Sequence, residues 1–165
     1  MVLEMTLGER AIAIAEQAHM NQKRRNGEPY IMHPRRVADK LTGDTQEARG
    51  RIKAIALLHD VLEDTPITVE YLRKAKIPED VIQAVAWLTR TKSASSGAPK
   101  ENYFEYIMGL IGFGNKDVLL VKLADLADNL SDLEEGSMKD KYRFAQYILS
   151  EEMNRKYPMW ISPEM

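Results

Sequence analysis

The stretch IALLHDVLEDT, residues 55–65, places one histidine and three carboxylates directly behind an apolar run. If the stretch is helical, residues four apart share a face, so His59 would lie over Glu63 and Asp60 over Asp64. The surrounding apolar residues predict that much of the stretch is buried. Buried carboxylates are unfavourable without a counter-charge, so a cation is expected near this point of the fold.

Two interpretations of this stretch have about equal support from its own residues. An imidazole beside a carboxylate can chelate a divalent cation, and two further carboxylates can orient or deprotonate a bound water. Alternatively, the acids are solvated charges at a helix end, and His59 with Asp60 forms an ordinary surface hydrogen bond. The rest of the chain must supply further ligands if the first interpretation is correct.

Working outward, apolar residues recur at helical spacing over nearly the whole chain. Thr6 and Glu9 have the spacing of a capping box at the start of the first helix. We expect helices over residues 6–23, 33–41, 45–64, 68–76, 78–88, 102–111, 118–132 and 142–152. No strand and no internal repeat is predicted. The fold class is therefore all-α, a compact irregular bundle of seven or more helices.

Two breaks between these helices have the composition of loops. Residues 24–30 contain Asn-Gly followed by Pro and form a candidate functional loop. Residues 93–99 are small, polar and rich in helix breakers, which fits an inert surface loop better than a lid over a site.

Composition limits the class of function. The chain has 165 residues, the size of one domain, and a net charge of −2, so no overall basic field favours DNA, RNA or an anionic membrane surface. It has no cysteine, which excludes disulfides and thiolate ligands. The first ten residues lack the apolar core of a signal peptide, and no apolar run is long enough to span a membrane. We expect a cytoplasmic protein; the sequence leaves a homo-oligomer open.

Two further polar residues stand out against this background. Asp125 lies within a strongly apolar helical segment, so its carboxylate is expected to point inward, either paired with Lys122 or an arginine or serving as a metal ligand. His33 precedes Pro34 at a helix start, where it is either a capping residue or a ligand. With His59 and Asp60 they would make a set of two imidazoles and two carboxylates, which suits Mn²⁺, Fe²⁺ or Zn²⁺.

The order of these motifs resembles a known family. QKRRNGEPYIMHP at residues 22–34, ALLHDVLEDT at residues 56–65 and VKLADLADN at residues 121–129 are similar to motifs of the HD phosphohydrolase superfamily. The similarity is greatest to the hydrolase domain of the RelA/SpoT homologues, which removes the 3′-pyrophosphate from guanosine tetra- and pentaphosphate, the alarmones of the stringent response. The resemblance implies a single HD phosphohydrolase domain over residues 1–165.

The resemblance also implies roles for individual residues. The metal ligands would be His33, His59, Asp60 and Asp125, with Mn²⁺ the usual metal and Zn²⁺ or Fe²⁺ as alternatives. Glu63 and Asp64 would position and activate the attacking water. The nucleotide contacts would be Arg24 on the guanine base and Asn129, with Lys23 and Arg25 as phosphate partners.

The sequence departs from the family pattern after Asp125. Asp128, Ser131 and Asp132 occupy places where the family commonly has basic or aromatic residues and an Arg-Thr-like pair, which puts more acid near an anionic substrate. The leading hypothesis is a metal-dependent alarmone 3′-pyrophosphohydrolase. The alternatives are an HD-type phosphatase for another nucleotide, such as a nucleoside monophosphate or NADPH, and a non-catalytic nucleotide-binding HD module.

Overall fold

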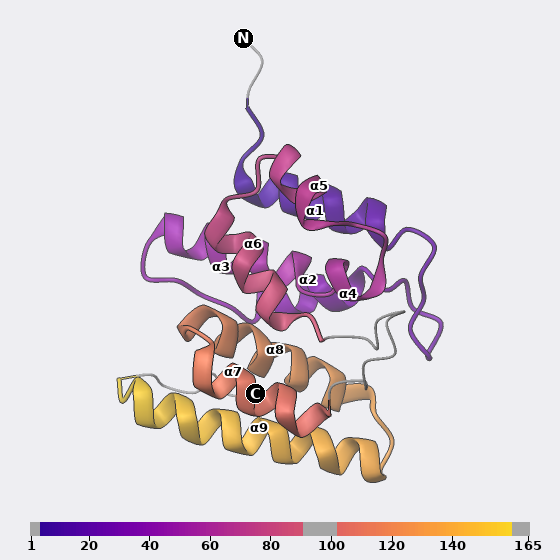
Figure 1. Cartoon of the computed structure of the whole chain (residues 1–165). Coiled ribbons are helices and arrows are strands. Elements are labelled where there is room, and N and C mark those ends of the chain that lie inside the picture. Colours follow the sequence, from indigo (N-terminus) through magenta and orange to yellow (C-terminus); the bar gives the residue numbers. More distant parts are fainter. Residues whose placement is uncertain (1–3, 91–101, 160–165) are drawn as a thin grey trace.

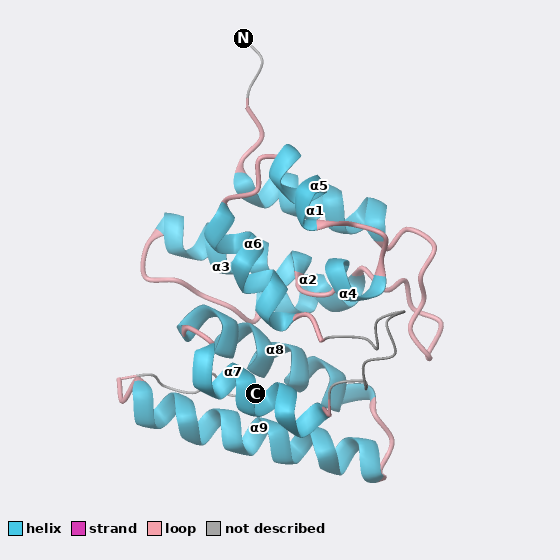
Figure 2. Ribbon diagram, viewed as in Figure 1, coloured by secondary structure: helices cyan, strands magenta, loops and turns pink. Residues whose placement is uncertain are grey.

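A computed structural model describes residues 4–90 and 102–159 of the chain. Within these residues all regular structure is helical (Figure 2). The helices are α1 (Leu7–Ala18), α2 (Met32–Asp39), α3 (Gln46–Leu58), α4 (Val61–Asp64), α5 (Val69–Lys74), α6 (Glu79–Leu88), α7 (Tyr103–Phe113), α8 (Lys116–Asp132) and α9 (Ser137–Lys156). The all-α expectation is confirmed. The candidate loop at residues 93–99 lies outside the described residues.

The helices form two groups that meet along α8. Helices α1 to α6 pack together above, and α7, α8 and α9 pack together below (Figure 1). Helix α8 contacts α2, α3 and α6 of the upper group as well as α7 and α9 of its own. Because these contacts bring segments far apart in sequence together, a side chain on the upper face of α8 can meet side chains of α2 and of the α3–α4 junction.

Local sequence signals set several helix starts. The Thr6 hydroxyl accepts the backbone N–H of Glu9, and the Glu9 carboxylate accepts the backbone N–H of Thr6, so the expected capping box is confirmed. The side chains of Thr45, Thr68 and Asn115 each accept one backbone N–H from the first turn of α3, α5 and α8, without the reciprocal bond. These side chains satisfy backbone N–H groups that the first helical turn leaves without partners.

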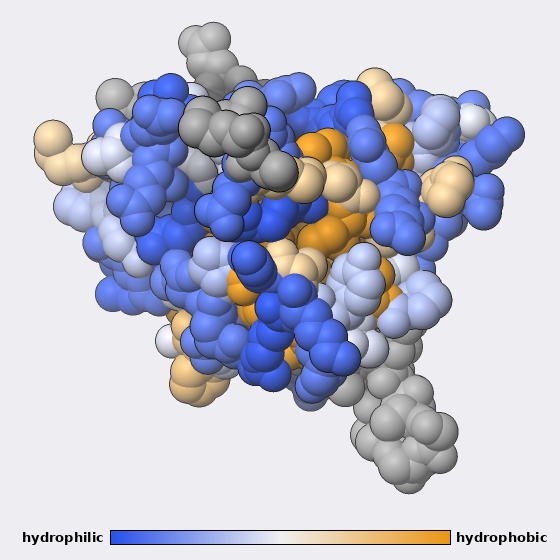
Figure 3. Space-filling view, turned by 90° about the horizontal axis from the view of Figure 1, so that it is seen from above, coloured by the Kyte–Doolittle hydropathy of each residue, from blue (hydrophilic) through white to orange (hydrophobic). Residues whose placement is uncertain are grey.

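A continuous apolar core lies between the helices. Several apolar side chains of α8, including Leu119 and Leu126, are fully buried in it. Seen from above, the surface is mainly hydrophilic, with apolar residues gathered to one side of the centre (Figure 3). None of the helices in the described ranges combines the length and apolar character that crossing a membrane requires.

Three expected helices differ clearly from those observed. The first, predicted over residues 6–23, ends at Ala18. The single helix predicted over residues 45–64 is wrong, because α3 ends at Leu58 and α4 begins at Val61 after a turn at His59 and Asp60. The backbone of Asp60, at φ −103° and ψ −6°, interrupts the helix. Helix α9 extends beyond the predicted residues 142–152 at both ends, where its residues are mostly polar and exposed and so carry little apolar periodicity.

Candidate metal centre

Four predicted ligand residues converge where α8 meets the upper group. His33 comes from α2, His59 and Asp60 from the turn between α3 and α4, and Asp125 from α8. The His33 Nε2 atom lies 3.1 Å from Asp125 Oδ1, and the His59 Nε2 atom lies 2.9 Å from Asp60 Oδ2. Ligand atoms of His33, His59 and Asp60 all lie within 4.8 Å of one another. One ion could therefore contact all three, and Asp125 borders the same point.

The donor atoms fit a divalent cation. The His59 Nδ1 atom lies 2.7 Å from the Ala56 carbonyl oxygen, which can only accept, so Nδ1 carries the ring proton. In the neutral ring this leaves a lone pair on Nε2, which is buried and makes no hydrogen bond of normal geometry with any described residue. A buried lone pair beside two carboxylates is a natural ligand for Mn²⁺, Fe²⁺ or Zn²⁺.

Asp125 uses its two oxygens for different partners. Lys122 Nζ lies 2.7 Å from Oδ2, so the pairing weighed from the sequence is present. Oδ1 accepts the Asn129 side-chain N–H at 2.6 Å and faces the imidazoles. Burial opposes ionisation of Asp125, but Lys122, His33 and His59 outweigh it and hold the pKa of the carboxyl well below its usual range. Pairing with lysine and a position at the metal centre are therefore compatible.

Asp60 has a hydrogen-bond donor that the sequence reasoning missed. The Tyr30 hydroxyl donates to Asp60 Oδ2 at 2.6 Å, and its ring packs against His19 with 4.8 Å between centroids. Burial and the Asp60 charge raise the pKa of Tyr30 far above its usual value, so the hydroxyl keeps its proton. The only available signal was the position of Tyr30 in the loop just before His33. His19 packs against Tyr30 and lies within hydrogen-bond distance of Gln22.

Glu63 and Asp64 lie on α4, one turn beyond Asp60. The Glu63 carboxylate is partly buried and accepts the backbone N–H of Arg90 at 3.0 Å. Asp64 is exposed, and its backbone carbonyl accepts the Gln22 side chain at 2.8 Å. The acid pair therefore follows the turn at His59 and Asp60 directly, with the Glu63 carboxylate held by the Arg90 backbone and Asp64 at an exposed position.

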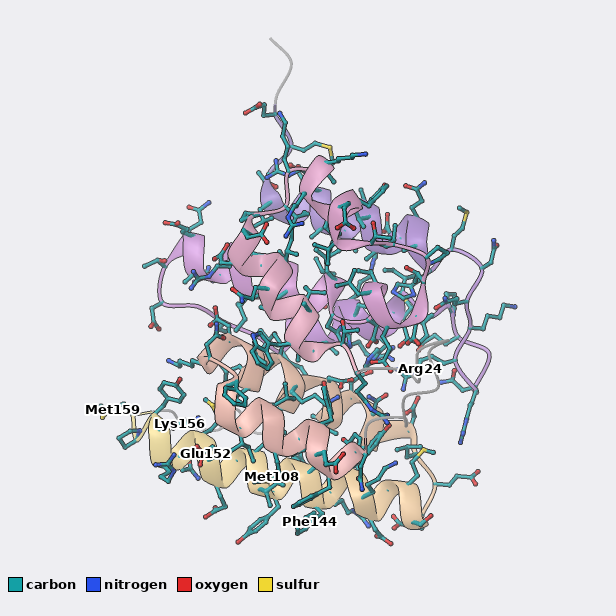
Figure 4. All side chains as sticks on the ribbon, viewed as in Figure 1. Arg24, Met108, Phe144, Glu152, Lys156 and Met159 are labelled. Atoms are coloured by element: carbon teal, nitrogen blue, oxygen red, sulfur yellow. The ribbon has the colours of Figure 1, made fainter. Side chains whose placement is uncertain are left out.

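The four predicted nucleotide contacts line one cavity. Its volume of about 320 Å³ is near the lower limit for small-molecule sites. Arg24 lies between the two helix groups (Figure 4) and donates to Asn129 Oδ1 at 3.2 Å and to Asp132 Oδ1 at 3.0 Å. The lining includes Lys23, Arg24, Arg25, Asn129, Asp132 and Tyr142. Lys23 and Arg25 are exposed.

The acids after Asp125 do not all face the cavity, which corrects the expectation of added acid near the substrate. Asp132 lines the cavity, whereas Asp128 is 2% exposed and lies behind the lining, between Arg24 Nη1 at 3.5 Å and the side chains of α2. There it lies 2.7 Å from His33 Nδ1 and accepts a 2.7 Å hydrogen bond from Arg36 Nε. Burial opposes ionisation of Asp128, but the hydrogen bonds from His33 and Arg36 lower its pKa to about 2. Ser131 donates to the Asp128 carbonyl at 2.6 Å.

Comparison with known proteins places this geometry in context. The family model described as "HD domain" matches residues 11–150. A guanosine-3′,5′-bis(diphosphate) 3′-pyrophosphohydrolase of Aquifex aeolicus is 38% identical over 126 residues, covering 76% of this chain and 17% of the relative. The bifunctional (p)ppGpp synthase/hydrolase SpoT of Escherichia coli is 37% identical over 142 residues, covering 81% and 19%. The chain thus spans less than a fifth of the length of these relatives.

A solved structure shares the fold. Its title reads "A metazoan ortholog of SpoT hydrolyzes ppGpp and plays a role in starvation responses". It aligns with a TM-score of 0.65 at 22% identity, covering 95% of this chain and 99% of that one. At this identity the likeness concerns the arrangement of the helices.

Proposed function

This chain belongs to the HD domain family, and from that premise we propose that its buried centre hydrolyses a pyrophosphate ester of a nucleotide with the help of a divalent cation. The best-matched substrate is guanosine 3′,5′-bis(diphosphate), from which the 3′-pyrophosphate is removed. The observation that carries the proposal is the convergence of two buried imidazoles and two carboxylates beside the cavity that contains Arg24 and Asn129. Relatives at 37–38% identity carry the name of this activity.

The proposed ligands are His33, His59, Asp60 and Asp125, with Mn²⁺ as the metal. When bound, the cation would lower the pKa of a coordinated water and neutralise charge on the phosphorus group. The surrounding residues prepare the ligands: the Ala56 carbonyl fixes the proton of His59 on Nδ1, Tyr30 holds one oxygen of Asp60, and Lys122 holds one oxygen of Asp125.

Glu63 and Asp64 are proposed to position the attacking water and take its proton. The water oxygen attacks phosphorus, the bond from phosphorus to the ribose 3′ oxygen breaks, and guanosine tetraphosphate yields GDP and pyrophosphate. The exposed Asp64 can pass the proton to solvent, whereas Glu63 is held by the Arg90 backbone and is suited to orienting the water.

Substrate binding is proposed to use the planar guanidinium of Arg24 against the guanine base and the Asn129 amide as a hydrogen-bonding partner. Arg24 is already held against α8 by hydrogen bonds to Asn129 and Asp132 and by an ion pair with Asp128. Lys23 and Arg25, exposed at the cavity, would attract the phosphates.

The test is release of pyrophosphate from guanosine 3′,5′-bis(diphosphate) by the purified chain with Mn²⁺. Asp64→Asn should reduce the rate by at least about 100-fold, as expected for loss of a general base. Asp44→Asn, which alters an exposed acid ahead of α3, is the matched control and should retain full rate.

A panel containing NADPH and nucleoside monophosphates separates the alternatives. Turnover of one of these nucleotides without turnover of the alarmone would replace the substrate and keep the reaction class. Binding of the alarmone without hydrolysis of any nucleotide would reject the enzyme and favour a non-catalytic binding module.

A further inference from the structure

We propose that Asp128 is a positioning residue that fixes the ring orientation and proton position of His33, so that His33 Nε2 is presented to the metal. The inference rests on the proposed role of His33 as a ligand. Asp128 would then act inside the protein on a ligand. From the sequence alone, it was expected to add negative charge near the substrate.

The geometry divides the two nitrogens of His33 between different partners. Nδ1 lies 2.7 Å from Asp128 Oδ2, and Nε2 lies 3.1 Å from Asp125 Oδ1 and 3.7 Å from Asp60 Oδ2. The His33 and Asp128 side chains are 1% and 2% exposed, so water does not compete for the contact. Carboxylates can only accept, so without metal the ring can direct a proton toward each of its two carboxylate partners. With a cation at the centre, Asp128 would keep the proton on Nδ1 and leave the lone pair of Nε2 for the ion.

Asp128 is itself held rigidly. Arg36 lies three residues after His33 on α2, so the two side chains project from the same side of the helix. It donates from Nε to Asp128 Oδ1 at 2.7 Å and from a terminal nitrogen to Oδ2 at 3.2 Å, a two-point contact that fixes the carboxylate plane. Glu28 accepts the remaining arm of Arg36 at 2.8 Å. The buried charge thus has a counter-charge and one orientation.

The second imidazole of the centre shows what is special about this arrangement. His59 directs its Nδ1 to the backbone carbonyl of Ala56, a neutral acceptor that no substitution removes. His33 uses a charged side chain on another helix instead. A charged acceptor makes the imidazole a stronger electron-pair donor to a cation. It also makes the orientation of His33 dependent on the packing of α2 against α8.

A purely structural role is the competing explanation, because Asp128 and Arg36 also join α8 to α2. Asp128→Asn separates the two roles, since the amide keeps the shape and loses the charge. Asp132→Asn is the matched control: Asp132 is on the same helix and pairs with Arg24, but makes no contact with His33 among the contacts described. Circular dichroism melting of each metal-free variant establishes that it is folded at the assay temperature.

The first readout is Mn²⁺ affinity, measured from the electron paramagnetic resonance signal of free Mn²⁺. Asp128→Asn should bind about 10- to 100-fold more weakly than wild type, the usual effect of removing an acceptor behind a ligand histidine. Asp132→Asn should stay within about 2-fold, given the modest effect of surface charges. Equal affinity of folded Asp128→Asn and wild type would overturn the inference, whereas a wild type that binds no Mn²⁺ would reject the proposed metal centre itself.

The second readout is the ring N–H proton of His33 in the Zn²⁺-loaded protein, assigned by its loss in His33→Ala. In wild type it should be shifted downfield and protected from exchange; in Asp128→Asn it should move upfield and exchange faster. An unchanged resonance would overturn the inference. Should Asp128→Asn fail to fold, Arg36→Lys replaces it: it keeps the charge but loses the two-point contact, and a several-fold loss of Mn²⁺ affinity is expected. Wild-type affinity in that variant would refute the proposal.

Discussion

At the residue scale, the metal centre depends on how each carboxylate divides its two oxygens. Asp125 gives Oδ2 to Lys122 and turns Oδ1 toward His33, while Asp60 receives the Tyr30 hydroxyl on the oxygen that faces His59. Lys122 is almost buried, and burial opposes its charge, but the Asp125 carboxylate raises its pKa well above the ordinary value. The centre therefore has a permanent internal counter-ion for one of its acids.

Replacing Lys122 by an uncharged residue should leave the Asp125 carboxylate without its charged partner. We expect Lys122→Met to lower the free energy of unfolding of the metal-free protein by about 3–5 kcal/mol, the range for breaking a buried ion pair. Mn²⁺ should restore more stability to this variant than to wild type, because the ion supplies the missing positive charge. Urea unfolding with and without Mn²⁺ measures both effects. Lys74→Met, at an exposed position of α5, is the control and should change neither quantity.

At the scale of single elements, the turn between α3 and α4 places the motif that dominates the sequence. Because the helix is interrupted at Asp60, His59 and Asp60 approach each other at 2.9 Å. The backbone N–H groups of Glu63 and Asp64 then donate to the Asp60 carbonyl and restart the helix. Two neighbouring residues thus become candidate ligands for one ion, and the acid pair follows on a short separate helix.

The boundary between α7 and α8 offers a matched pair of glycine substitutions. A Cβ at Gly114 would clash with the Leu110 carbonyl oxygen, so Gly114→Ala requires the backbone to shift and should destabilise the protein by about 1–3 kcal/mol. A Cβ at Gly109, inside α7, would have no neighbour within 4 Å among the described residues. Gly109→Ala should stabilise by about 0.5–1 kcal/mol through helix propensity. Opposite shifts in thermal midpoint are expected, and shifts of the same sign would contradict this account of the boundary.

At the scale of the whole molecule, the proposed ligands come from both helix groups. Asp125 belongs to the lower group, and the other three belong to the upper one (Figure 1). The contact between His33 and Asp128 joins the same two groups beside the centre. A bound ion would therefore act as a cross-link between them, and metal binding and global stability should be linked.

This linkage predicts a metal-dependent thermal midpoint. At a Mn²⁺ concentration about 100 times the dissociation constant, binding to the folded state adds about 2.7 kcal/mol, which corresponds to a rise of roughly 5–10 °C for a chain of this size. Excess chelator should remove the rise, and His33→Ala should abolish it. Calorimetry measures the shift. If the thermal unfolding midpoint of wild type is the same with and without Mn²⁺, an ion held between the two helix groups would be ruled out.

Local patterns in the sequence were sufficient for the helices and for the candidate ligands. Apolar spacing and the Thr6–Glu9 capping box specify helices because both act within one or two turns of the chain. The motifs around His33, His59 and Asp125 could be identified because their residue types and order are characteristic of HD phosphohydrolases. Apolar spacing does not predict the turn after Leu58, because apolar residues continue through it. Their spacing carries no information on the backbone angles of Asp60.

The sequence by itself determined an all-helical chain and a set of imidazoles and carboxylates able to hold a cation. Only the tertiary structure decided what each of those groups faces. His33 and Asp128 are 95 residues apart and meet because α2 packs against α8, and Tyr30 reaches Asp60 across 30 residues. No local pattern encodes such contacts, because they depend on how whole helices pack. For the same reason, no local pattern shows that Asp128, one of the acids after Asp125, is turned toward His33 and Arg36 of α2.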